Sequence, residues 1–116
     1  MIALNLDRAP ATRRPRYEVG QIVRHRRYGY RGVVVAVDRR CEASEDWYQS
    51  NNTQPPRRQA WYHVLVHETE HSTYAAEENL ADLQPIEEVW HPWLPLFFDG
   101  FSAGRYVRNN EPWPVK

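Results

Sequence analysis

The chain has 116 residues, enough for one domain, and its 15 basic and 15 acidic side chains leave no net charge. This balance excludes the strong basic excess of a dedicated DNA-binding domain. No apolar run reaches the roughly 18 residues of a membrane helix, and the first residues lack the pattern of a signal peptide. Cys41 is the single cysteine, so no internal disulfide can form and we expect a cytoplasmic protein with no role at a membrane.

The charges are unevenly divided along the chain. Residues 1–60 contain twelve arginines and six acidic residues, whereas residues 61–116 contain three basic and nine acidic residues. This division would create a positive and a negative face if the two halves stayed apart, and would cancel if they intermixed. Strands of small barrels pair across the chain, so both outcomes stay open.

The N-terminal third is expected to form a flexible arm followed by a β-hairpin. Residues 1–16, the basic arm, contain two prolines that interrupt helix and several arginines that repel one another. Residues 21–26 are a plausible strand, and a glycine-containing turn follows at 28–32. The β-branched run 33–37 predicts a central strand that is buried on both faces.

A long polar insertion, residues 39–59, interrupts the strand pattern. Its part 42–48 is compatible with one or two helical turns, with Trp47 and Tyr48 packed back on the barrel. Residues 50–56 have no periodicity and the composition of a mobile loop.

Residues 60–67 have the clearest strand pattern of the chain. Side chains alternate between the two faces of a strand. One face would carry Tyr62, Val64 and Val66, and the opposite face Trp61, His63, Leu65 and His67. A turn at 68–71 leads to a short strand at 72–76, which Asn79 and Leu80 close. Leu83 is expected to start a last short strand before Pro85.

Residues 86–116 form an aromatic C-terminal extension in which we expect a short helix around 92–98. So much aromatic surface is unfavourable in water, and self-association therefore stays open. Four side chains are expected to pack on the barrel or on a partner subunit: Trp90, Trp93, Phe97 and Phe98.

Residue types that could carry chemistry are present but poorly arranged. His63, His67 and His71 recur every four residues, yet on a strand His63 and His67 would lie about 13 Å apart, too far for one metal ion. Glu77 and Glu78 are predicted to lie in a strand and to face opposite ways. The cysteine has no activating surroundings, and neither a glycine-rich phosphate loop nor a nucleophile elbow occurs. We therefore expect a protein that is not an enzyme and that uses no cofactor and no metal.

The strongest candidate for a binding site is the basic hairpin, a cluster of four arginines, one histidine and two tyrosines: Arg24, His25, Arg26, Arg27, Tyr28, Tyr30 and Arg31. Arginines neutralise phosphates and aromatic rings stack on bases or sugars, so this mixture is typical of nucleic-acid binding. The alternative is a hairpin whose arginine stems cover apolar surface while their charged ends stay in water.

Five short segments of the sequence form a recognisable series: residues 17–21, 24–25, 28–34, 61–66 and 74–80. In order and spacing they resemble the YccV-like family, also called the hemimethylated-DNA-binding domain, which includes the heat-shock protein HspQ. The resemblance covers about residues 17–84. It implies a mostly β fold, an SH3-like β-barrel of about five strands at 17–85 with the insertion at 39–59.

The C-terminal extension carries a second resemblance, in residues 91–92, 96–98 and 105–107. These are similar to the segment that follows the domain in an F-box protein and in bacterial stand-alone versions. The sequence contains no F-box, so the resemblance does not imply a ubiquitin-ligase function.

The family resemblance implies two functions, both of them binding without catalysis. One is preferential binding of hemimethylated DNA near replication origins. The other is an accessory or adaptor role in ATP-dependent proteolysis, in which the domain binds a protease of the Lon or Clp type or its clients. DNA is our first expectation because the basic hairpin gives it a physical basis, and the zero net charge keeps a protein partner as the alternative.

Overall fold

The computed structural model describes residues 14–114, so most of the expected basic arm at 1–16 lies outside the described residues. The strands are β1 (Ile22–His25), β2 (Arg31–Asp38), β3 (Trp61–Val66), β4 (Ser72–Ala76), β5 (Leu80–Asp82), β6 (Phe98–Ser102) and β7 (Arg105–Arg108). The helices are α2 (Glu45–Ser50), the 3-10 helix η1 (Glu77–Asn79) and α3 (Leu94–Phe97). None of the helices in this part of the chain is long and apolar enough to cross a membrane.

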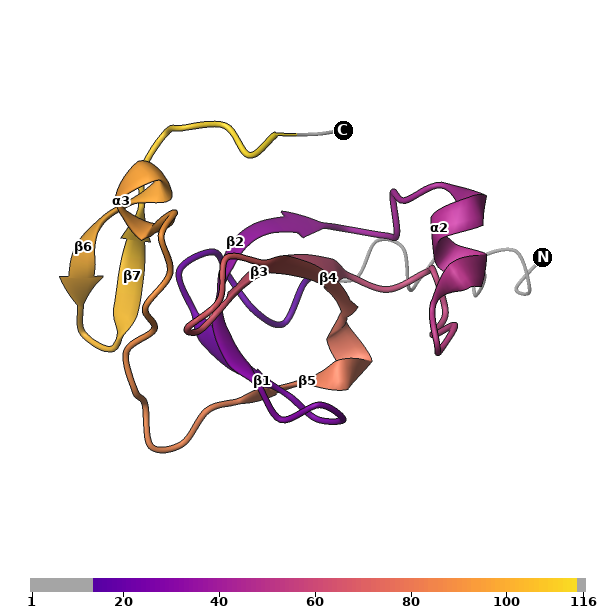
Figure 1. Cartoon of the computed structure of the whole chain (residues 1–116), viewed down its shortest axis with the longest axis horizontal. Helices are drawn as coiled ribbons and strands as arrows, with labels where there is room; N and C mark the ends of the chain where they lie inside the picture. The colour runs from indigo at the N-terminus through magenta and orange to yellow at the C-terminus, as the bar shows by residue number, and fades with distance from the viewer. Residues whose placement is uncertain (1–13, 115–116) are drawn as a thin grey trace.

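The first five strands form one antiparallel sheet in the order β4-β3-β2-β1-β5 (Figure 1). The prediction of a mostly β fold with about five strands is therefore confirmed. No strand pairing joins β4 to β5 among the described residues, so closure of the sheet into a barrel is not detected. A separate two-stranded sheet, β6 with β7, follows in the extension and was not predicted from the sequence.

The central position of β2 follows from its valines. Val33, Val34 and Val35 are completely buried, and β2 pairs with β1 on one side and β3 on the other. A run of β-branched side chains suits a strand that is covered on both faces. The predicted hairpin, with strands at 21–26 and 33–37, and its buried central strand are thus confirmed.

Two apolar clusters lie on opposite faces of the sheet. The first contains Tyr62 and Val64 of β3, together with Tyr17 and other buried side chains. The second contains Leu65 of β3 and reaches across to the extension, where it includes Val89, Phe97, Phe98 and Tyr106. Neighbouring residues of β3 therefore face different clusters, as the alternation in the sequence predicts.

The extension packs on the sheet at the end opposite to α2 (Figure 1). Its predicted helix is present as α3, and Phe97 and Phe98 are buried. Trp90 and Trp93 keep 59% and 40% of their surface exposed, so the cover expected for these two rings is not found within the described chain.

Two expectations about residues 77–85 were wrong. Glu77 and Glu78 lie in η1 and not in a strand, because the chain must turn there from β4 back toward β1. The last strand of the sheet begins at Leu80, not at Leu83, and Leu80 pairs with His25. The 3-10 turn makes the connection between β4 and β5 short. The last strand of the sheet therefore starts three residues before the expected position, Leu83.

The insertion forms the predicted helical turns, shifted toward the C-terminus. Helix α2 begins after Ser44, whose hydroxyl accepts a hydrogen bond from the amide of Trp47 at 3.1 Å and caps the helix. Trp47 and Tyr48 pack against Trp61 of β3, as expected.

The oppositely charged halves of the chain meet at several points. Arg31 forms an ion pair with Glu87 at 3.1 Å, and Arg105 pairs with Glu18. The two halves therefore intermix at these contacts, and part of their opposite charge cancels locally.

Candidate functional site

The basic hairpin does not form a single surface. Arg24 pairs with Arg31 across β1 and β2, and the next pair along the hairpin is His25 with Tyr30, whose carbonyl accepts from the His25 amide at 2.8 Å. Because successive residues of a strand point to opposite faces, Arg24 and Arg31 share one face and His25 and Tyr30 the other. Arg26, Arg27 and Tyr28 form the turn between them, so the structure divides the seven predicted residues into three groups.

Arg31 is committed to contacts within the protein. Its guanidinium pairs with Glu87, donates hydrogen bonds to the carbonyl of Glu88 at 3.2 and 3.0 Å, and lies 3.0 Å from Nε2 of His67. These contacts fasten the start of the extension to β2. The guanidinium of Arg31 is therefore largely occupied by contacts within the protein and is less available to a partner.

The other three arginines of the basic hairpin are exposed. Arg26 donates one hydrogen bond, from Nε to the carbonyl of Leu80 at 3.0 Å. The Arg27 guanidinium lies 5.7 Å from the centre of the Tyr28 ring, and the side chain of Arg24 makes no hydrogen bond or ion pair with the described residues. Arg24, Arg26 and Arg27 thus form the cationic part that a partner can reach, and we call them the arginine rim.

His25 holds the turn together. It is buried, and its Nδ1 accepts hydrogen bonds from the amides of Arg27 and Tyr28 at 3.2 and 3.1 Å. Burial, reinforced by the charge of Arg27, lowers the pKa of His25. The ring is therefore neutral at physiological pH and carries its proton on Nε2, since Nδ1 is an acceptor. Tyr28 stacks on it with ring centres 4.7 Å apart.

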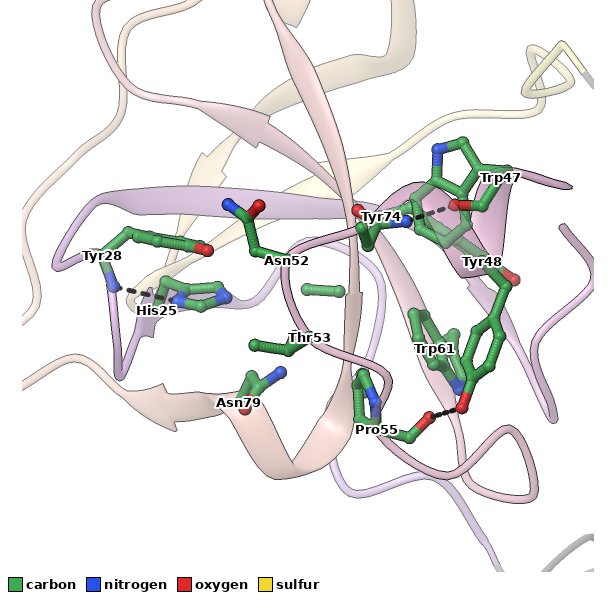
Figure 2. Close-up of a pocket in the computed structure, with 13 residues that line it drawn as sticks. His25, Tyr28, Trp47, Tyr48, Asn52, Thr53, Pro55, Trp61, Tyr74 and Asn79 are labelled. Carbon is green, nitrogen blue, oxygen red and sulfur yellow. Dashed lines mark hydrogen bonds between the residues drawn. The ribbon is translucent and has the colours of Figure 1, made fainter.

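A hollow, here called the aromatic groove, lies beside β4 between the basic hairpin and the insertion (Figure 2). It has two adjoining parts with volumes of about 470 and 100 Å³. Five residues line both parts: His25, Tyr28, Trp47, Asn51 and Tyr74. The described side chains that line it include no aspartate, glutamate, arginine or lysine.

The insertion builds one wall of the aromatic groove. Trp47 packs edge-on against Trp61 and Tyr74, at 6.2 and 5.5 Å between ring centres. The side-chain amide of Asn51 donates to the carbonyl of Trp47 at 2.7 Å, and the hydroxyl of Tyr48 donates to the carbonyl of Pro55 at 2.9 Å. Sequence reasoning predicted that Trp47 would pack but missed this wall, because nothing in the sequence indicates that residues 47–55 return to the hairpin turn.

Hydroxyl contacts hold the tyrosines around the aromatic groove. The Tyr74 hydroxyl donates to Asp38 Oδ2 at 2.6 Å, and burial together with this bond raises the pKa of Tyr74. Tyr30 shares a hydrogen bond of 2.7 Å with Thr73 of β4. Tyr28 differs from both, because its ring is 57% exposed.

The three histidines at four-residue spacing have separate partners. His63 lies 3.4 Å from Asp38, yet burial outweighs that carboxylate and lowers the pKa of His63. His67 Nδ1 accepts from the amide of Trp90 at 2.8 Å, and the carbonyl of His71 contacts His91 Nε2 at 2.9 Å. Among residues 14–114, no group of three potential ligands is close enough to hold a metal ion.

A family profile described as "Hemimethylated DNA-binding protein YccV like" matches residues 15–105. The chain belongs to the YccV-like family. The matched region contains the whole five-stranded sheet, the insertion and most of the extension, and the YccV-like domain is generally a non-catalytic binding module.

Curated relatives carry the name F-box only protein 21. The proteins of Homo sapiens and Pongo abelii are each 34% identical to the chain over 98 residues, and that of Mus musculus is 33% identical. The alignment covers 82% of this chain but only 15–16% of each relative. The chain therefore corresponds to about one sixth of these larger proteins.

Proposed function

We propose that the chain is a non-catalytic module that binds duplex DNA through its arginine rim and prefers hemimethylated sites. The observation that carries the proposal is the arginine rim, three exposed arginines at the end of β1 and in the turn that also carries the exposed Tyr28, in a chain whose family is named for this ligand. Arginine side chains at a turn can follow the phosphates of a duplex, and these contacts position the protein without reading the sequence.

Recognition of a methyl group requires a close apolar contact in the major groove. Of the two tyrosines of the basic hairpin, Tyr28 is the better placed to supply it, because it is exposed in the turn next to Arg27. Tyr30 is partly buried and tied to Thr73. We therefore assign the methyl contact to Tyr28.

The test is a salt titration of binding to hemimethylated, fully methylated and unmethylated duplexes of one sequence. The slope of log affinity against log salt should fall by about 0.9 for each phosphate contact removed. The triple variant Arg24→Ala, Arg26→Ala, Arg27→Ala should flatten the slope by up to three such steps and weaken binding to all three duplexes alike. Arg105→Ala, on β7 and paired with Glu18, is the matched control and should bind as the wild type does.

Failure of the wild type to bind any of the three duplexes at low salt contradicts the DNA proposal. Binding without preference for the hemimethylated duplex contradicts only the assignment of methyl recognition. In that second case Tyr28→Ala should lower affinity for the three duplexes by the same factor.

A second candidate function is the accessory role in ATP-dependent proteolysis. It is favoured by exposed apolar side chains on the extension, where Trp90 and Leu96 keep 59% and 52% of their surface exposed. Such side chains are typical of protein-binding surfaces. Degradation of a client by a Lon- or Clp-type protease should then change when the protein is added, and Trp90→Ala should remove that change.

The SH3-like barrel that the resemblance implies remains part of the proposal. The antiparallel order, in which β5 returns to pair with β1, supports it. Slow amide exchange in β4 and β5, at the two ends of the sheet, would be expected if these strands close on each other.

A further inference from the structure

We propose that the aromatic groove is a binding site for a nucleobase that has been turned out of the DNA duplex. This inference rests on the proposed DNA binding and adds a second contact, separate from the phosphate contacts of the arginine rim. Its basis is the combination of aromatic walls, free hydrogen-bonding groups and the position of the charges around the groove.

Aromatic rings stand at two ends of the aromatic groove (Figure 2). The stacked pair of His25 and Tyr28 lies at the hairpin end, and Trp47 with Tyr74 lies at the insertion end. Bases stack on aromatic side chains without regard to sequence, because every base has a π face. The larger part, at about 470 Å³, lies within the usual volume of small-molecule sites, roughly 300–1,000 Å³.

Polar groups without partners among the described residues line the smaller part of the groove, about 100 Å³, which adjoins the larger part. The side chains of Asn52, Thr53 and Asn79 make no hydrogen bond with the described residues. The Nε2 of His25 is likewise free, and Figure 2 shows this edge of the ring directed into the groove. Because Nδ1 accepts from the turn, Nε2 carries a hydrogen and is a fixed donor. Amide and hydroxyl groups supply both donors and acceptors, which the polar edge of a base requires.

The distribution of charge around the groove favours a ligand that has a neutral ring attached to an anionic phosphate backbone. None of the described residues that line the aromatic groove carries a carboxylate, so a cationic side chain or ligand would find no counter-charge among them. The nearby carboxylate of Asp38 already accepts from Tyr74 and contacts His63. Positive charge begins at the rim, where Arg26 and Arg27 directly precede Tyr28 and can meet the phosphates that flank a base.

A base held in this way must first leave its pair, so the cost of unpairing should be visible in binding. That cost is least for a base that is already mispaired. A protein that holds an extruded base therefore binds a mismatched duplex more tightly than the paired duplex, whereas a protein that contacts only phosphates binds both alike.

The first experiment measures affinity for two duplexes that differ by one central mismatch. We expect the wild type to prefer the mismatched duplex by about tenfold. Asn52→Ala and Asn79→Ala should reduce this ratio toward one. Gln49→Ala is the matched control, because Gln49 is exposed on α2 and does not line the groove, and it should keep the wild-type ratio.

The second experiment adds deoxycytidine monophosphate to the full chain and follows backbone amides by NMR. We expect shifts at Tyr28, Thr53 and Asn79. In parallel, reduced carboxymethylated lactalbumin serves as an unfolded protein that tests the groove as a peptide site.

The outcomes separate this inference from the proposed function. Equal affinity for the two duplexes, with no shifts on adding the nucleotide, overturns the base site and leaves DNA binding intact. If the protein binds no duplex but the nucleotide shifts its amide signals, the groove is a nucleobase site, and the proposal that its base comes from a DNA duplex is overturned. Shifts caused by the unfolded protein and not by the nucleotide overturn the inference in favour of a peptide site.

Discussion

The backbone of Tyr106 lies directly on Gly20. The Tyr106 amide donates to the Gly20 carbonyl at 2.8 Å, and the Tyr106 carbonyl occupies the space that a Cβ on Gly20 would need. Gly20 also has a φ of 90°, a conformation that other residues adopt only with strain. This contact joins strand β7 to the residues just before β1, so the extension is fastened to the start of the sheet.

Gly20→Ala should therefore lower the free energy of unfolding by roughly 2–4 kcal/mol, from backbone strain plus the clash with Tyr106. Gly29→Ala is the matched control. Gly29 also has a positive φ, 77°, but has open space where a Cβ would stand, so only the strain, about 1 kcal/mol, should remain. Urea unfolding measures both, and equal losses would show that the contact with Tyr106 does not limit stability.

Phe97→Ala should destabilise the protein by roughly 3–5 kcal/mol, because this ring is buried between the extension and the sheet. The neighbouring substitution Leu96→Ala should cost less than about 1 kcal/mol, since half of that side chain is exposed. Thermal unfolding of the two variants compares them under one condition. Similar melting temperatures would mean that the extension is an independent appendage.

Arg24 and Arg31 are paired across β1 and β2, yet substitution by alanine should affect different properties: stability at Arg31 and DNA binding at Arg24. Arg31→Ala removes the bonds to Glu88 and should lower stability by roughly 1–2 kcal/mol, with little of this loss from the half-exposed ion pair to Glu87. Arg24→Ala should stay within about 0.5 kcal/mol of the wild type and should weaken DNA binding. Equal effects of both changes on binding would contradict the conclusion that Arg31 is held by Glu87 and Glu88 while Arg24 is accessible to a partner.

Stability should fall as the pH drops below about 7. Burial lowers the pKa of His25, His63 and His91 in the folded state, whereas the unfolded chain titrates near the ordinary value of 6.5. Between these values the unfolded state binds protons that the folded state does not, which favours unfolding, and above pH 7 the effect vanishes. Urea midpoints from pH 5.5 to 8 measure this dependence, and His25→Gln should reduce the slope by up to one proton. A flat profile would contradict the shifts.

The main strands of the sheet could be predicted from the sequence because their residue patterns are local. The valines at 33–35 and the alternation along 61–66 specify buried strands in any context that can cover them. The hairpin β6–β7 was missed because its strand Phe98–Ser102 contains Asp99, Gly100 and Ser102, and all but its first residue are exposed. Such a segment carries no alternation to recognise.

For the candidate site, the sequence supplied the residues but not their grouping. The density of arginine and tyrosine at 24–31 marked the basic hairpin, and the choice of these residues rested on their charge and expected exposure. Neither could indicate that Arg31 is held by Glu87 and Glu88, because those partners lie 56 and 57 residues away along the chain.

The sequence by itself determined the mostly β class, the positions of the main strands along the chain and the presence of a basic turn, since each depends on neighbouring residues. Only the tertiary structure decided which arginines remain free and that Trp47 and Tyr28, far apart in sequence, line one groove. The physical reason is that a groove and an ion pair are made by contacts between distant segments. Their geometry follows from how the sheet, the insertion and the extension pack, and local propensity does not encode it.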